Sequence, residues 1–144
     1  MKNLKFFYSL VLAVLNIITS IYLFYRFVVS KFAAWPGTVA GFEDMAKTIN
    51  IDPVFFRWMS GIVILIASIG ILLNGIRYFS GIVRGKVALI LNYWTIMSMI
   101  SALVAEFFLR TEPKLGLVYF AIFIILLAII NLVSIKRLLR IENN

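Results

Sequence analysis

Long stretches without a charged side chain dominate the hydrophobic pattern of this sequence. They cover residues 6–25, 58–76, 87–105 and 115–135. A helix needs roughly 17–25 mainly apolar residues to cross the hydrocarbon core of a bilayer, and each stretch, with its flanking residues, has that length. We therefore predict four membrane-spanning helices. Their expected bounds are about 6–29, 56–79, 87–109 and 115–135.

The segment 30–55, between the first two predicted spans, has a different pattern. A Pro-Gly step at Pro36 breaks the chain, and Thr38 is a suitable cap for a short helix beginning at Val39. Apolar residues up to Ile49 then fall on one helical face, and the charged residues fall largely on another. This pattern predicts an amphipathic helix at the outer membrane interface. Trp35 and Trp58 are expected near head-group level, and Phe42 is a further interfacial residue.

The remaining connections are short. Asp52 supplies a side-chain cap and Pro53 suits a first helical position, so we expect the second long helix to begin there. Residues 81–86 and 110–116 form turns, and short turns make sequential helices pack as antiparallel neighbours. The expected fold class is therefore all-α integral membrane. Residues 1–144 form a single domain, an antiparallel four-helix bundle with a short interfacial helix between helices one and two.

Composition favours a membrane protein and removes several kinds of chemistry. Apolar residues make up 63% of the chain, far above the roughly 45–50% of soluble proteins. Cysteine and histidine are absent, which excludes disulfides, thiol nucleophiles and histidine-ligated metals or haem in this chain. The basic residues behind the net charge of +8 flank the apolar stretches, so lipid head groups, and not nucleic acid, are the expected partner. The first stretch is longer than a signal-peptide core, and we expect it to be retained.

The distribution of Lys and Arg predicts the orientation. Four spans place both termini on one side, together with the turn at 81–86. Eight basic residues belong to that side, namely Lys2, Lys5, Arg77, Arg84, Lys86, Lys136, Arg137 and Arg140, and six to the other, namely Arg26, Lys31, Lys47, Arg57, Arg110 and Lys114. The positive-inside rule counts these residues, so it favours cytoplasmic termini in a multi-pass protein of the inner membrane.

Each predicted span carries small and polar residues at helical spacing. Helices associate in lipid through such residues, because they let backbones approach and side chains hydrogen-bond. The expected inward stripes are Ser9, Ala13, Asn16 and Ser20 in helix one, Gly61, Ser68 and Gly75 in helix two, Asn92, Thr95, Ser98, Ala102 and Ala105 in helix three, and Ala121, Ala128 and Asn131 in helix four. The opposite faces, rich in Ile, Leu, Phe and Val, are expected to meet lipid.

Two groups of polar residues are candidate sites. By their depth, Asn74, Asn92 and Asn131 are expected to form one amide layer near the cytoplasmic ends of their helices, with Asn16 alone nearer the midplane. These asparagines either join the helices by hydrogen bonds or line the polar end of a pocket for a quinone or lipid head group.

Charged residues near the outer ends of helices one and three form the second candidate site. Glu106 is expected to pair with Arg26 or with Arg110, which follows it by four residues in the order that favours a helical ion pair. A proton relay through Glu106 is the alternative. We favour the structural pair, because both helix ends lie close enough to the interface for side chains to reach water.

A succession of features along most of the chain resembles the DoxX-like family of small four-helix membrane proteins. They are a Lys-aromatic pair closing helix one (Lys31, Phe32), a short helix with Phe42 and Ala46, a hydrophobic-x-Pro step (Ile51, Pro53) and a helix opening near Gly61. The resemblance implies the four-helix architecture, and some members of the family are described as accessories of quinol-linked oxidoreductases. The chain departs from the pattern at Val28, where a glycine is common, and at Ile64, where an acid is common. The resemblance therefore predicts architecture and not an activity.

The function expected first is that of a non-catalytic accessory or scaffold subunit of a membrane complex, with another membrane protein or a second copy as partner. The alternative is a bundle that binds a quinone or lipid under an outer helical lid and serves a membrane oxidoreductase. No other cofactor and no metal is expected. An enzyme is the least favoured class, because hydroxyl side chains occur without a base and the glycines form no phosphate-binding loop.

Overall fold

The computed structural model describes residues 2–80 and 85–142, with side chains over 6–80 and 85–137. This part of the chain consists of helices and contains no strand. The first long helix is made of α1 (Lys2–Leu23), a π-helical segment η1 (Phe24–Val29) and α2 (Ser30–Phe32). It is followed by α3 (Pro36–Ile49), α4 (Pro53–Ser80), α5 (Gly85–Val104) with a second π-helical segment η2 (Ala105–Leu109), and α6 (Leu115–Glu142).

Four of these helices are long and apolar enough to cross a membrane. The candidate spans are Phe6–Phe32, Pro53–Ser80, Gly85–Leu109 and Leu115–Arg137. The predicted all-helical chain with four membrane-length helices is confirmed. The second long helix begins at Pro53 as predicted, because the Asp52 Oδ1 accepts a hydrogen bond of 2.7 Å from the Phe55 N–H.

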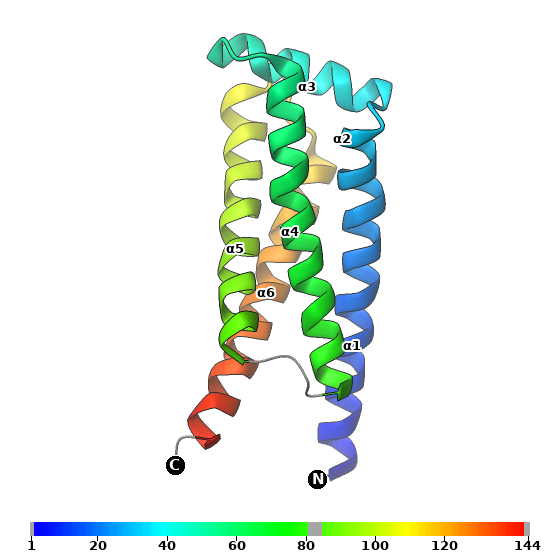
Figure 1. Ribbon diagram of the computed structural model, residues 1–144, viewed down its shortest axis with the longest axis vertical. Coiled ribbons are helices and arrows are strands. Elements are labelled where there is room, and N and C mark those ends of the chain that lie inside the picture. Colours follow the sequence, from blue (N-terminus) through cyan, green and yellow to red (C-terminus); the bar gives the residue numbers. More distant parts are fainter. Residues whose placement is uncertain (1, 81–84, 143–144) are drawn as a thin grey trace.

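The four long helices stand side by side, and α3 lies across one end of them (Figure 1). We call this end of the bundle the α3 end. Both chain termini lie at the opposite end, which we call the terminal end. The first long helix packs against α4, α4 packs against α5, and α5 packs against α6. Residues 81–84 and the side chains of Lys2, Lys5 and Arg140, on which part of the charge prediction rests, lie outside the described residues.

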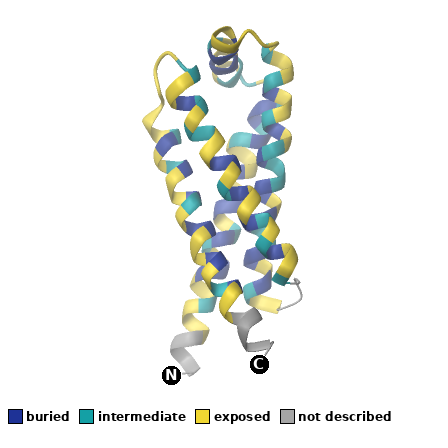
Figure 2. Cartoon of the chain, turned by 90° about the vertical axis from the view of Figure 1, so that its left-hand side faces the viewer, coloured by how far each residue is buried: buried dark blue, intermediate teal, exposed yellow. Residues whose placement is uncertain are grey.

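The predicted inward stripes are confirmed. Ser9, Ala102 and Ala105 are half-buried, and the other twelve residues of the stripes are buried. Figure 2 shows buried residues on the facing sides of the helices and exposed residues around the outside. Large apolar side chains such as Ile18, Met97 and Leu126 are exposed there, as expected for a surface that faces lipid.

The contact between α1 and α4 shows how small residues hold two helices together. Ser20 Oγ donates to the Ser68 carbonyl at 2.8 Å, and Ser68 Oγ donates to the Ser20 carbonyl at 3.0 Å. A Cβ placed on Gly75 would lie 2.7 Å from the Ile17 side chain and 3.1 Å from the Ala13 carbonyl oxygen. The two helices are therefore held by a reciprocal pair of hydrogen bonds and by an approach that leaves no room for a side chain at Gly75.

We expect Gly75→Val to destabilise the bundle by about 1–3 kcal/mol, because the added atoms must push α1 away from α4. The same substitution at Gly116 is the control, since a Cβ there would meet nothing within 4 Å. The measurement is thermal unfolding of the purified protein in detergent. Equal unfolding temperatures for the two variants would contradict the role given to Gly75.

Candidate functional site

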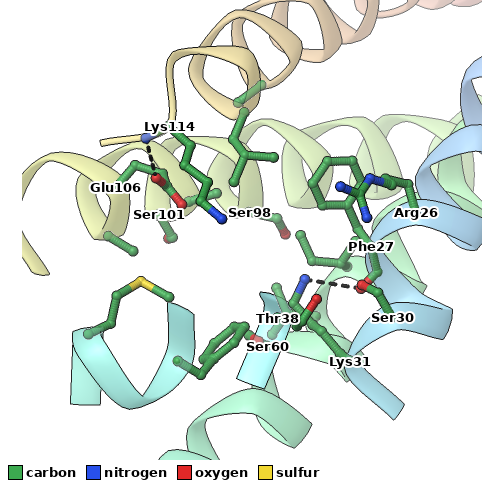
Figure 3. A pocket seen from close by; sticks show the side chains of 18 of the residues that line it. Arg26, Phe27, Ser30, Lys31, Thr38, Ser60, Ser98, Ser101, Glu106 and Lys114 are labelled. Atoms are coloured by element: carbon green, nitrogen blue, oxygen red, sulfur yellow. Dashed lines mark hydrogen bonds between the residues drawn. The ribbon is translucent and has the colours of Figure 1, made fainter. Parts of the chain in front are cut away.

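A cavity of about 710 Å³ lies beneath α3, among the ends of the long helices. Its size falls within the roughly 300–1,000 Å³ of small-molecule sites. Every long helix and α3 contribute to its wall, which is mainly apolar and includes four phenylalanines. These are Phe27, Phe42, Phe56 and Phe120. The polar residues carry hydroxyl groups or charges. They are Ser30, Thr38, Ser60, Ser98 and Ser101, and Arg26, Lys31, Glu106, Arg110 and Lys114; Figure 3 labels all of them except Arg110 around the space.

Lys31 is a buried cation in this wall, with 7% of its surface exposed. Its Nζ donates a hydrogen bond of 3.0 Å to the Phe27 carbonyl, four residues earlier in the helix. It also lies 5.5 Å from the ring centroid of Phe27 and 5.6 Å from that of Phe42. An ammonium group carries three N–H donors, and one of them is used by the carbonyl. The two rings attract the charge without accepting a conventional hydrogen bond, so donors remain for a further acceptor.

Glu106 is the acidic residue of the cavity wall and is also buried. Its Oε2 lies 3.2 Å from Arg110 Nε and accepts a hydrogen bond of 3.1 Å from the Lys114 backbone N–H. Arg110 Nε has no aligned hydrogen-bond acceptor, so its contact with Glu106 is an ion pair by proximity alone. Arg26 is not part of this pair, because its guanidinium lies over the Trp35 ring at 5.9 Å.

Two π-helical segments supply residues to the cavity. η1 carries Arg26 and Phe27, and η2 carries Ala105 and Glu106. A π turn holds more residues than an α turn, so it widens the helix and redirects the side chains that follow; such segments are rare and are frequent at functional sites. Both lie where their helices approach α3. The two helices therefore depart from regular geometry at the cavity.

The short helix α3 covers the cavity with its apolar face. Phe42, Met45 and Ala46 are buried on the bundle side, and the Phe42 ring meets the Phe56 ring edge-on at 5.2 Å. Phe42, predicted as an interfacial residue on the apolar face of this helix, points into the bundle, where that face packs against the ends of the long helices. The predicted Thr38 cap is wrong. The helix begins at Pro36 without a side-chain cap bond.

Polar contacts attach α3 to the connection between α5 and α6. The Asp44 carboxylate accepts hydrogen bonds from the Thr111 N–H at 3.0 Å and from Thr111 Oγ1 at 2.7 Å. Thr48 Oγ1 donates to the Leu109 carbonyl at 2.9 Å. The bonds from the Thr111 backbone and side chain hold the pKa of Asp44 below its ordinary value of 3.8. We call these three hydrogen bonds the α3 latch.

The two tryptophans predicted at the interface both lie at the α3 end. Trp35 immediately precedes α3 and meets the Tyr25 ring edge-on at 5.6 Å. Trp58, near the start of α4, is half exposed and meets the Phe32 ring at 4.8 Å. Trp35 also lines the cavity, whereas Trp58 does not belong to its wall.

Aromatic rings close the side of the cavity between the first long helix and α6. The rings of Phe27 and Phe120 are stacked at 5.4 Å, and the Tyr22 ring meets Phe120 edge-on at 4.9 Å. The large rings fill the space between the two helices, so the helix backbones need not approach each other closely at this seam.

The opposite seam lies between α4 and α5. Trp94 Nε1 donates to the Val63 carbonyl at 3.1 Å and joins the two helices. Met59 and Ser101 lie nearer the α3 end than this bond; both line the cavity and both are exposed. These two residues therefore belong both to the cavity wall and to the surface of the bundle.

The four asparagines form two reciprocal pairs. Asn16 and Asn131 exchange hydrogen bonds of 3.2 and 2.8 Å between α1 and α6. Asn74 and Asn92 exchange bonds of 3.2 and 3.1 Å between α4 and α5. The expectation that Asn16 stands alone is wrong, because it faces Asn131. Tyr78 adds a bond of 3.1 Å from its hydroxyl to Asn131 Oδ1, which links α4 to this pair.

The asparagine pairs are separate from the cavity. None of the four residues belongs to its wall. Three of them also donate to the carbonyl four residues earlier, namely Asn16 to Leu12, Asn74 to Gly70 and Asn92 to Ala88. Their amide hydrogens are thus used within the protein. The geometry is that of residues that join helices.

Sequence reasoning gave no binding role to Lys31 or Lys114, which it counted only as flanking charges. The available signal was the position of Lys31 within the Lys-aromatic pair, directly before a short helix rich in apolar residues. No family model matches the chain, no curated protein matches it, and no solved structure matches it. The resemblance to the DoxX-like family stays a prediction.

We predict that Asn16 and Asn131 are energetically coupled. In a double-mutant cycle with Asn16→Ala and Asn131→Ala, the coupling energy should be about 0.6–1.7 kcal/mol, the range of interhelical hydrogen bonds in membrane proteins. A cycle between Asn16→Ala and Asn92→Ala is the control and should show no coupling, because these residues belong to different pairs. Unfolding in detergent provides the free energies. Equal coupling in both cycles would contradict the pairing.

We also predict that the α3 latch weakens in acid. A carboxyl group whose pKa is lowered on folding stabilises the folded state above its unfolded pKa. For Asp44 this stabilisation is complete above pH 3.8, the ordinary pKa. It is lost as the pH falls through the lower pKa that Asp44 has in the folded protein. Hydrogen exchange at the Thr111 amide, corrected for the intrinsic rate, should be protected above this range and lose protection below it. Asp44→Ala should remove the protection and its pH dependence, and a pH-independent wild type would contradict the assignment.

Proposed function

We propose that this protein is a membrane protein that binds a lipid-like amphiphile in the cavity beneath α3. The observation that carries the proposal is a cavity of ligand size with an apolar wall and a small set of polar groups beneath α3. Sites for small molecules combine these two kinds of surface, because the apolar wall provides affinity and the polar groups fix orientation. Two functions were expected from the sequence, an accessory subunit and a bundle that binds a quinone or lipid. The cavity supports the second.

The proposal includes the arrangement of the chain in the membrane. The four long helices cross the inner membrane as antiparallel neighbours, both termini are cytoplasmic, and α3 lies at the outer interface. The location of α3 at one end and of both termini at the other is compatible with this topology. So is the excess of basic residues on the terminal side. The exposed apolar side chains around the bundle then lie in hydrocarbon.

In this arrangement α3 is a lid over the bound molecule. It covers the cavity with Phe42 and Met45, and the α3 latch attaches it to the connection between α5 and α6. The latch is a small set of hydrogen bonds at partly exposed positions, which water can replace at little cost. We place the path of an acyl chain from the bilayer between α4 and α5, where Met59 and Ser101 line the cavity and are exposed.

An accessory role follows from binding. A protein that holds an amphiphile without transforming it would store the molecule or pass it to another membrane protein. Service to an oxidoreductase remains a prediction from the resemblance to the DoxX-like family, and so does the quinone as ligand.

We predict that filling the cavity abolishes binding. Ala102 lines the cavity from α5, so Ala102→Trp should occupy the space and remove bound amphiphile. Ile100→Trp is the matched control, because Ile100 lies on the same helix, is exposed and does not belong to the cavity wall. Native mass spectrometry of protein purified in mild detergent, incubated with hexadecanol or hexadecyl phosphate, measures retention. Thermal unfolding confirms that both variants fold.

The proposal fails if wild-type protein retains neither compound. It also fails if Ala102→Trp retains as much as Ile100→Trp does, since the molecule would then lie elsewhere on the bundle.

A further inference from the structure

We propose that the cavity selects an amphiphile with an anionic head group, a phosphate or a carboxylate, and that Lys31 binds this group. The inference rests on the proposed function and adds to it the chemical class of the ligand. It also assigns the two ends of the ligand to two parts of the cavity wall.

The wall of the cavity carries an excess of positive charge. Four basic residues line the cavity, namely Arg26, Lys31, Arg110 and Lys114, against a single acid, Glu106. The Glu106 carboxylate is engaged directly by Arg110 and by the Lys114 backbone N–H, and it attracts Lys31 only through space. One carboxylate therefore offsets only part of the charge of four cations. A wall with this excess attracts an anion and repels a second cation.

Lys31 is a buried cation without an ion-pair partner in the part of the chain that the structure describes. A buried charge is costly unless it is paired and hydrogen-bonded. Among the described residues no carboxylate forms an ion pair with Lys31; its direct contacts are one carbonyl oxygen and two aromatic rings, and Glu106 attracts it only through space. In Figure 3 its amine points into the cavity, and the amine of Lys114 enters from the other side. An anionic oxygen between them would provide the missing partner and form charge-assisted hydrogen bonds.

The opposite part of the wall is apolar. Leu23, Ile64, Met99 and Ala121 line the cavity on the side away from α3 and belong to the apolar core of the bundle. A ligand that only carried charge would leave this surface unused. An amphiphile covers both parts, with its head near Lys31 and its chain along these residues, and so burial of apolar surface adds to the charge interaction.

A neutral quinone fits the cavity less well. The aromatic wall suits its ring, but a carbonyl oxygen would meet Lys31 without neutralising it. An inorganic anion would neutralise Lys31 but would gain nothing from the apolar wall. The phosphate or carboxylate amphiphile satisfies both.

The test compares hexadecyl phosphate with hexadecanol, which has the same chain without the charge, and with inorganic phosphate, which has the charge without the chain. Binding is measured by native mass spectrometry and by titration of the full-length protein in detergent. Wild-type protein should bind hexadecyl phosphate at least about tenfold more tightly than hexadecanol, as expected for a charge-assisted hydrogen bond. Inorganic phosphate should bind weakly and compete poorly.

Variants assign the preference to Lys31. Lys31→Met should reduce the preference for hexadecyl phosphate about tenfold while it leaves hexadecanol binding unchanged. Lys31→Arg should keep the preference, since it keeps the charge. Lys47→Met is the matched control, because Lys47 is exposed on α3 and does not line the cavity. It should bind both compounds as the wild type does.

The outcomes separate the two proposals. Equal binding of the two compounds by wild-type protein would overturn the anionic head group and leave the cavity as a binding site. A preference that survives in Lys31→Met would overturn the role of Lys31. If inorganic phosphate bound as tightly as hexadecyl phosphate, the site would be one for free anions, and the amphiphile as ligand class would be overturned. Binding of neither long-chain compound would overturn the proposed function itself. The comparison of the two compounds in wild-type protein tests the anionic head group even if Lys31→Met does not fold.

Discussion

The interior of this bundle depends on one constraint, which is that a polar group surrounded by hydrocarbon must find its partner within the protein. In the half of the bundle near the termini the constraint is met by reciprocal pairs. Asn16 pairs with Asn131 and Asn74 pairs with Asn92. The buried cations meet it less completely. Lys31, towards the α3 end, has one hydrogen-bond acceptor for three donors, and Arg57 Nη1, Arg77 Nε and Arg110 Nε have no hydrogen-bond partner among the described residues. Of these residues Lys31 and Arg110 line the cavity, so the half near α3 is the half suited to binding.

The same contrast appears in the packing. Gly70 and Gly75 allow α4 to approach its neighbours so closely that a Cβ would lie within about 3 Å of another helix. Near α3 the helices are instead separated by large rings such as Phe27 and Phe120, and two of them change to π-helical geometry. Small residues bring helices together and large residues hold them apart. The order in which these residue types occur along the chain therefore determines where the cavity forms.

Sequence reasoning succeeded where a local rule was sufficient. Uncharged stretches predict membrane-length helices, a stripe of small residues predicts a buried face, and Asp52 before Pro53 predicts a helix start. It failed where the answer depends on how helices are placed relative to one another. Asn16 was left without a partner because depth along a span does not say which face meets which helix. Lys31 was read as a flanking charge because its position beside an apolar stretch does not say that its side chain lines a cavity. No residue type encodes a π turn.

The position of the cavity makes the two faces of the protein unequal. It lies beneath α3, whereas the interior near the termini is filled by paired amides and close helix contacts. In the proposed arrangement, a molecule held in the cavity would contact the leaflet on the α3 side, and the packed half would separate it from the other leaflet. The bundle would then exchange its occupant with one monolayer, and a lipid of the opposite monolayer would first have to cross the membrane by another route.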